Sequence, residues 1–143
     1  MCSMWMRCSP TSLEGSEMGE GPPKARVLVV DDAVFMRRQL RAILEEAGYS
    51  VIAEAADGAE ALELYETHQP DLTTLDLVMP KMPGLETLRE LRRRHPQARV
   101  IVCSSVSDEP SIFGAIASGA RDYVLKPVSP KRVLEAVEKA LKS

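Results

Sequence analysis

The sequence has few cysteines, no long apolar run and no excess of positive charge, and each of these absences excludes a class of protein. Its three cysteines are odd in number and poorly placed for a disulfide framework, so we expect a protein of the reducing cytoplasm. The longest apolar runs are strand-sized, far short of the roughly 20 residues that cross a bilayer. Lys and Arg number 18 against 21 Asp and Glu, so no basic field is present to bind nucleic acid directly.

Phosphate-binding glycine motifs are also missing. Neither G-x-G-x-x-G nor G-x-x-x-x-G-K-[ST] occurs, which argues against a nucleotide-binding α/β module. With 143 residues, 45% of them hydrophobic, the chain can bury the core of one domain but is too short for two catalytic domains.

The first 24 residues differ in composition from the rest of the chain. Ser, Gly, Pro, Glu and four of the seven Met gather there, without the continuous apolar stretch of a signal peptide. We therefore predict a disordered extension over residues 1–24 and one folded domain over residues 25–143. A misassigned start, with Met18 as the true first residue, remains an alternative.

From residue 25 onward, short apolar runs rich in β-branched residues alternate with longer stretches of helical periodicity. The runs predict five buried strands, at Val27–Val30, Val51–Ala55, Leu72–Leu75, Val100–Cys103 and Tyr123–Leu125. Turn residues punctuate this pattern: Gly48 and Gly119 suit helix ends, Pro130 suits a first helical turn, and Pro83-Gly84 predicts a turn with Gly at its third position. Five βα units with right-handed crossovers predict an α/β fold with a doubly wound parallel sheet.

Polar side chains follow the predicted strands, at the edge where doubly wound sheets bind their ligands. If the strand order is 2-1-3-4-5, the first and third strands are neighbours, and the residues at the strand ends converge: Asp31, Asp32, Asp76, Ser104 and Lys126. Three carboxylates in one crevice repel each other by about 4 kcal/mol per pair at 4 Å and an effective dielectric of 20. A hard divalent cation removes this repulsion, so the pattern predicts Mg²⁺ beside a lysine, a clamp suited to phosphoryl transfer onto a carboxylate.

Four segments carry a resemblance to a known family. They are Val-Leu-Val-Val-Asp31-Asp32, then Asp71-Leu-Thr-Thr-Leu-Asp76-Leu-Val-Met79-Pro80-x-Met-x-Gly84, then Ile-Val-Cys-Ser104, and Gly119-Ala-x-Asp-Tyr123-Val-Leu-Lys126-Pro127. Over residues 25–143 the chain resembles the receiver domain of bacterial two-component response regulators, most of all the stand-alone, CheY-like chemotaxis type. The resemblance implies a flavodoxin-like (βα)5 fold and a phosphorylation switch that is not an enzyme.

The resemblance also assigns roles to individual residues. It implies that Asp76 accepts the phosphoryl group and that Lys126 binds it, that Asp31, Asp32, Asp76 and the carbonyl of Val78 hold Mg²⁺, and that Ser104 and Tyr123 form the switch. The implied partners are a histidine kinase and a protein target such as the flagellar motor switch. Val78 and Val106 depart from the polar side chains that many relatives carry beside the site, and Pro83 replaces the usual Asp or Asn.

Two other functions remain open alternatives. The chain could be the receiver of a longer regulator with a DNA-binding or methylesterase domain. A Mg²⁺-dependent phosphatase of the haloacid dehalogenase type also forms an aspartyl phosphate. That family requires an acid two residues after the nucleophile, where this sequence has Val78.

Overall fold

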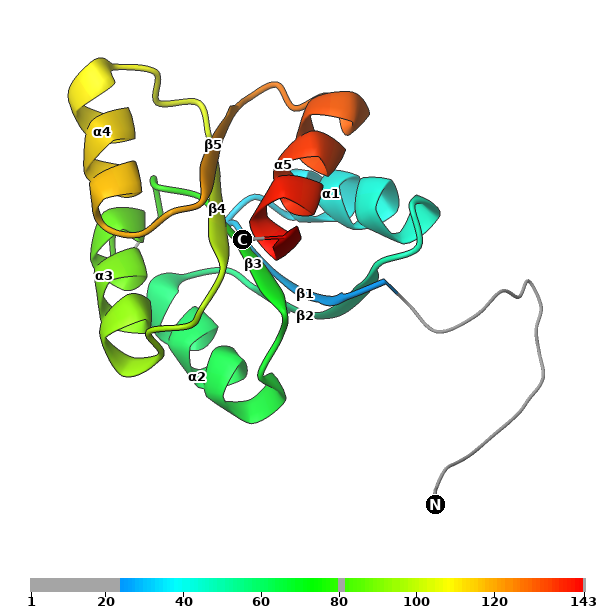
Figure 1. Cartoon of the computed structure of the whole chain (residues 1–143), viewed down its shortest axis with the longest axis horizontal. Coiled ribbons are helices and arrows are strands. Elements are labelled where there is room, and N and C mark those ends of the chain that lie inside the picture. Colours follow the sequence, from blue (N-terminus) through cyan, green and yellow to red (C-terminus); the bar gives the residue numbers. More distant parts are fainter. Residues whose placement is uncertain (1–23, 80–81, 143) are drawn as a thin grey trace.

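A five-stranded parallel sheet forms the centre of the molecule, seen in a computed structural model that describes residues 24–79 and 82–142 (Figure 1). The strands are β1 (Arg26–Val30), β2 (Ser50–Ala55), β3 (Leu72–Leu75), β4 (Val100–Ser104) and β5 (Asp122–Leu125). The helices that follow them are α1 (Val34–Glu46), α2 (Gly58–His68), α3 (Gly84–Arg94), α4 (Glu109–Ala117) and α5 (Pro130–Lys142). The predicted extension over residues 1–24 lies outside the described residues, apart from Lys24.

The strand order is β2-β1-β3-β4-β5, so the predicted doubly wound topology is confirmed. The register pairs Val30 of β1 with Leu75 of β3, which places the residues after both strands side by side. Each predicted strand lies within one residue of its observed bounds. Alternation of buried strands with amphipathic helices was therefore a sufficient signal for the fold class.

Helices cover both faces of the sheet. Figure 1 shows α1 and α5 on one face and α2, α3 and α4 on the other. The hydrophobic core divides in the same way: Leu40 and Val137 belong to the cluster under α1 and α5, whereas Leu62 and Leu88 belong to the cluster under α2 and α3. The three central strands are buried on both faces, which explains the near-continuous apolar sequences of β1 and β4, while β3 buries two threonines between its two leucines. No helix of the described part is long and apolar enough to cross a membrane.

Two of the predicted helix ends are confirmed, and one predicted turn is wrong. Gly48 and Gly119 have φ angles of 99° and 111°, in the left-handed region that glycine adopts without a steric cost. Pro83-Gly84 does not form the expected turn with Gly at its third position, because Gly84 is already the first residue of α3. Glycine is required there for another reason: a Cβ on Gly84 would lie 2.2 Å from the carbonyl oxygen of Asp76.

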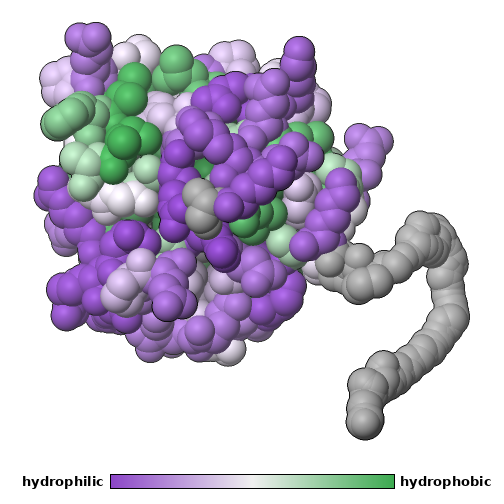
Figure 2. All heavy atoms as spheres, in the orientation of Figure 1, coloured by the Kyte–Doolittle hydropathy of each residue, from purple (hydrophilic) through white to green (hydrophobic). Residues whose placement is uncertain are grey.

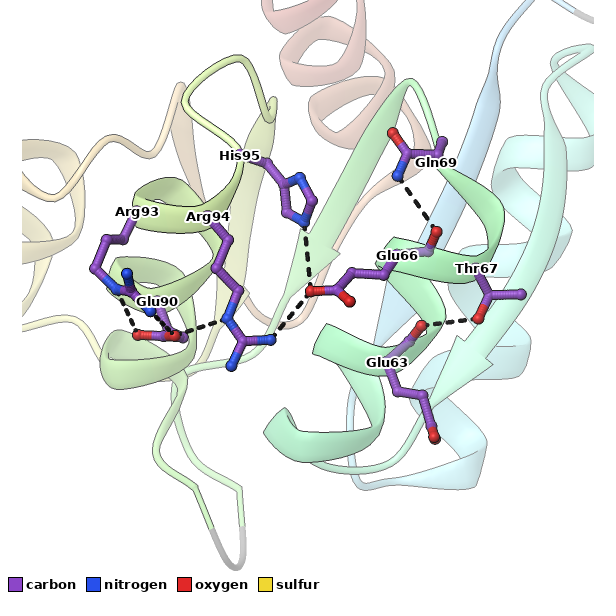
Figure 3. A network of polar contacts seen from close by, with 8 residues as sticks. All are labelled: Glu63, Glu66, Thr67, Gln69, Glu90, Arg93, Arg94 and His95. Carbon is purple, nitrogen blue, oxygen red and sulfur yellow. Dashed lines mark hydrogen bonds and ion pairs between the residues drawn. The ribbon is translucent and has the colours of Figure 1, made fainter.

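A polar network joins α2 to α3 at the surface (Figure 3). Nη1 of Arg94 lies 3.1 Å from Oε2 of Glu66, and Nε of the same guanidinium donates a 2.7 Å hydrogen bond to Glu90. Arg93 also donates to Glu90, and these two arginines lower the pKa of the Glu90 carboxyl to about 2. Because the pairs are exposed, we assign the network a small part in stability.

Candidate functional site

Three carboxylates meet where β1 and β3 end. Each of Asp31, Asp32 and Asp76 offers an oxygen, and these oxygens all lie within 4.8 Å of one another. Asp31 and Asp76 are 1% and 5% exposed, while Asp32 faces solvent. The structure thus brings the three predicted acids together, and the parallel pairing of β1 with β3 is the cause.

Backbone amides fix the direction of the two buried carboxylates. Oδ1 of Asp31 accepts a 2.9 Å hydrogen bond from the amide of Ala33, and Oδ1 of Asp76 accepts one of 3.3 Å from the amide of Val78. The amide of Gly84 donates to the carbonyl of Leu77 at 3.0 Å, which draws the start of α3 against the backbone of the site. The Asp76 side chain is therefore held by the loop that follows its own strand.

Lys126 places its ammonium group between the two buried acids. Its Nζ lies 2.7 Å from Oδ2 of Asp31 and 3.4 Å from Oδ2 of Asp76. The strand end is fixed by the amide of Lys126, which donates to the carbonyl of Ser104 at 2.9 Å, and the following bond to Pro127 is cis. Burial lowers the pKa of Lys126, but the hydrogen bond to Asp31 and the charge of Asp76 outweigh it, so the pKa is raised overall.

Burial raises the pKa of the Asp76 carboxyl above its ordinary value. The positive charge of Lys126 opposes this shift, and the nearby Asp31 carboxylate adds to it. Asp76 is thus a partly desolvated anion whose charge is incompletely compensated by the protein. Such a group favours the approach of a further cation.

Ser104 and Tyr123 meet at the loop that follows β4. Ser104 is fully buried, and its Oγ accepts a 3.1 Å hydrogen bond from the amide of Val106. The hydroxyl of Tyr123 donates a 2.6 Å hydrogen bond to the carbonyl of the same residue. The Tyr123 ring is 8% exposed and therefore packs inward. Both side chains predicted to switch contact one segment, residues 104–106.

The donor set fits a hard divalent cation. Carboxylate oxygens are the ligands that Mg²⁺ prefers, and an exposed Asp32 leaves the crevice open to water. Among the described residues, the soft ligands lie away from this edge: Cys103 is buried in the core with its pKa raised to about 12, and His68 and His95 end α2 and follow α3. Zinc is correspondingly disfavoured by the residues at this edge.

One contact at the site was missed by the sequence analysis. Arg37, in the first turns of α1, donates a 2.5 Å hydrogen bond from Nη1 to the backbone carbonyl of Asp31. Nothing in the local sequence distinguishes Arg37 from its neighbour Arg38, because both lie in the same helix. The two differ only in the direction of their side chains, which the fold decides.

Comparisons with known proteins agree with this geometry. Residues 27–138 match the family described as the response regulator receiver domain. Chemotaxis protein CheY of Bacillus subtilis (strain 168) is 46% identical over 116 residues, 81% of this chain and 97% of that protein.

Two solved structures share the fold. A chain of the CheX-CheY-BeF3-Mg²⁺ complex from Borrelia burgdorferi superposes with a TM-score of 0.77 at 38% identity, covering 78% of this chain and 85% of that one. The response regulator domain of Thermotoga maritima CheB superposes with a TM-score of 0.76 at 35% identity, covering 82% and 96%. The chain therefore belongs to the response regulator receiver domain family.

Proposed function

We propose that the protein is a phosphorylation-activated response regulator in which Asp76 accepts a phosphoryl group from a histidine kinase. The observation that carries this proposal is the convergence of Asp31, Asp32 and Asp76 within 4.8 Å of one another, with Lys126 bonded to two of them. A structural role would not explain why repelling carboxylates are kept together. We assign the receiver to residues 25–143 and an extension to residues 1–24.

The transfer step needs a nucleophile and compensation of charge. A carboxylate oxygen of Asp76 attacks the phosphorus, the bond from phosphorus to the donor breaks, and the donor leaves as a histidine imidazole or, from acetyl phosphate, as acetate. Mg²⁺ held by Asp31, Asp32, Asp76 and the carbonyl of Val78 would supply positive charge that offsets the repulsion between two anions. Lys126 then turns from the carboxylates to a phosphoryl oxygen.

Ser104 and Tyr123 would pass the change to the surface. A phosphoryl group on Asp76 adds a charge of about −1.5 to −2 and three acceptor oxygens, which draw the Ser104 hydroxyl away from the amide of Val106. The Tyr123 hydroxyl shares that residue as its partner, so its ring must repack when the loop moves. The affected face consists of α4, β5 and α5.

This face carries exposed apolar side chains that suit a protein partner. Phe113 is 75% exposed, and Ile116 and Leu125 are also exposed. Figure 2 shows hydrophobic surface gathered over α4, beside mostly hydrophilic surface. We propose that the output is a protein target, possessing an apolar surface of its own, rather than nucleic acid or a membrane.

The relative named as a chemotaxis protein supports a role in chemotaxis. We propose the flagellar motor switch as the target and the cytoplasm as the location. We propose a signalling role and no turnover of a separate substrate. A phosphatase of the haloacid dehalogenase type is disfavoured, because that family requires an acid two residues after the nucleophile and this chain has Val78 there. The likeness to the CheB domain supports one further candidate, the receiver of a longer regulator.

Phosphoryl uptake tests the proposal directly. The full chain is incubated with acetyl phosphate and Mg²⁺, and intact mass should show one phosphoryl addition. The addition should vanish in Asp76→Asn and with a chelator, while Asp71→Asn, at the residue that precedes β3, retains it. Wild-type uptake by Asp76→Asn would overturn the assignment. The target is tested separately, by the affinity of phosphorylated and unmodified protein for purified flagellar switch protein, which should be higher for the phosphorylated form.

A further inference from the structure

Arg37 links the acidic site to the edge strand of the sheet. Arg37 lies one turn after the start of α1. Its side chain is 15% exposed and lies between the loop after β1 and strand β2. Nη1 donates to the backbone carbonyl of Asp31 at 2.5 Å, and Nε donates to Oε1 of Glu54 at 3.1 Å. One planar guanidinium therefore joins the peptide that follows Asp31 to a carboxylate on β2.

Glu54 is itself held firmly. Its second oxygen, Oε2, accepts a hydrogen bond from Arg41, one helical turn beyond Arg37. Arg41 also donates to the carbonyl of Val51 at 3.2 Å, so Glu54 is fixed by two arginines of α1. The Glu54 carboxylate is therefore a fixed hydrogen-bond acceptor. It holds the Arg37 guanidinium in place, and the guanidinium in turn holds the loop after β1.

The peptide that Arg37 binds is the one between the two adjacent acids. Asp31 and Asp32 must both direct their carboxylates toward Asp76. Asp32 faces solvent, and its carboxylate has no hydrogen-bond partner among the described residues. The Asp31 side chain is oriented by the amide of Ala33 and by Lys126. The hydrogen bond from Arg37 to the Asp31 carbonyl fixes the orientation of the peptide plane between Asp31 and Asp32, and so the direction of the Asp32 side chain.

We propose that Arg37 is a positioning residue for divalent cation binding, acting through the Asp31 carbonyl and not through its charge. The inference rests on the proposed function, because it assigns Arg37 to the same cation site. The two ways of acting predict opposite changes in Mg²⁺ affinity when the guanidinium is removed. A guanidinium that acts by charge repels a cation, so its removal strengthens Mg²⁺ binding, whereas a guanidinium that orients the loop weakens Mg²⁺ binding when removed.

Calorimetric titration of the full chain with Mg²⁺ separates these cases. Arg37→Gln, which loses the charge, and Arg37→Lys, which keeps it, should both raise the Kd for Mg²⁺ by about tenfold, as is usual when a partner behind a metal ligand is lost. The matched control is Arg38→Gln, an exposed arginine one position along α1, whose Kd should equal that of wild type. A wild-type or lower Kd in Arg37→Gln overturns the proposal, and so does full rescue by Arg37→Lys.

A second readout distinguishes positioning from general loss of structure. In Arg37→Gln the Mg²⁺ concentration that gives half-maximal phosphoryl uptake should rise, while the uptake at saturating Mg²⁺ returns to the wild-type level. If phosphoryl uptake by Arg37→Gln stays below the wild-type level at saturating Mg²⁺, the proposal that Arg37 acts only by positioning the cation site is contradicted. Absence of Mg²⁺ binding by wild type would instead remove the proposed function, so the two failures are distinguishable.

If both Arg37 variants fail to fold, Glu54→Gln carries the test. This variant retains Arg37 but weakens the ion pair between Arg37 and residue 54. Hydrogen exchange measures the mobility of the loop after β1 in the absence of any added cation. The peptide containing Asp32 and Ala33 should exchange faster than in wild type. Unchanged exchange in that peptide overturns the proposal.

Discussion

The ammonium of Lys126 lies closer to Asp31 than to Asp76, at 2.7 Å from one carboxylate and 3.4 Å from the other. Lys126 therefore acts as an internal counter-ion of the acidic crevice. This arrangement connects the stability of the fold with the occupancy of the site, since the same carboxylates are proposed to bind Mg²⁺.

Replacing Lys126 by Gln should destabilise the metal-free protein. The change leaves two buried carboxylates without their cation, at a cost of about 3 kcal/mol in the free energy of unfolding. Mg²⁺ should restore more stability to Lys126→Gln than it adds to wild type, because binding to the folded state alone is stabilising. Thermal melts with and without Mg²⁺ measure both effects, with the exposed Lys131→Gln as control. Equal metal-free melting temperatures in wild type and Lys126→Gln would contradict the counter-ion role.

The stability of the metal-free protein should depend on pH through Asp76. Burial raises the pKa of this carboxyl above 3.8, so the folded state binds a proton more readily than the unfolded state. The cost of the buried charge is therefore present at neutral pH and is relieved as the pH falls through the folded-state pKa. Asp76→Asn should melt higher than wild type at pH 7, and this advantage should shrink as the pH falls towards 4.

The control for this pH series is Glu46→Gln, an exposed acid on α1. Its melting temperature should stay at a constant offset from wild type over the same range. An advantage of Asp76→Asn that is independent of pH would show that the charge of Asp76 is not the cause.

Replacing Ser104 by Ala should uncouple phosphorylation from output. The variant keeps the nucleophile and the acids, so phosphoryl uptake should continue, at a cost of about 1 kcal/mol in stability for the unpaired amide of Val106. Phosphorylation should no longer change hydrogen exchange in the peptide around Tyr123. The adjacent Ser105→Ala, which alters an exposed hydroxyl, should respond as wild type does. A wild-type response in Ser104→Ala would remove Ser104 from the switch.

The phosphoryl lifetime should depend on Val78 and Val106. Hydrolysis needs a water in line with the phosphorus, and a side chain that hydrogen-bonds this water would orient its attack. Neither valine can do so, and Val78 is exposed beside Asp76. A Val78→Asn, Val106→Glu double variant should lose its phosphoryl group several-fold faster after donor removal, as followed by intact mass. Identical decay rates would leave the valines with a packing role alone.

A buried hydroxyl in β3 offers a test of stability away from the chemistry. Oγ1 of Thr74 is buried and has no hydrogen-bond partner among the described residues. Thr74→Val should raise the free energy of unfolding by about 1 kcal/mol, because an unsatisfied polar atom is replaced by a methyl group. Thr87→Val is the matched control, since that buried hydroxyl donates to the carbonyl of Pro83 at 3.0 Å, and it should lower stability. Denaturant unfolding of both variants decides the sign.

Sequence periodicity was enough to predict the layers, the strands and the placement of the acids. Period and turn residues act locally, so Gly48 and Gly119 were identified correctly as helix ends. The start of α3 at Gly84 was not predicted, because its cause is a close approach to the backbone of Asp76, eight positions earlier. Side-chain directions were also beyond the sequence: the contact of Arg37 with Asp31 depends on how α1 lies against β2.

The close approach of Gly84 to Asp76 has a consequence for mutational tolerance. A methyl group at Gly84 would overlap the Asp76 carbonyl oxygen at 2.2 Å and the Cα of Leu77 at 2.4 Å, and both of these are backbone atoms that cannot rotate away. In a saturation library selected for signalling, position 84 should therefore reject substitutions as strictly as the phosphoacceptor itself does, although glycine contributes no reactive group. Conservation of this site should thus depend on Gly84, which contributes the absence of a side chain and the amide that donates to the Leu77 carbonyl.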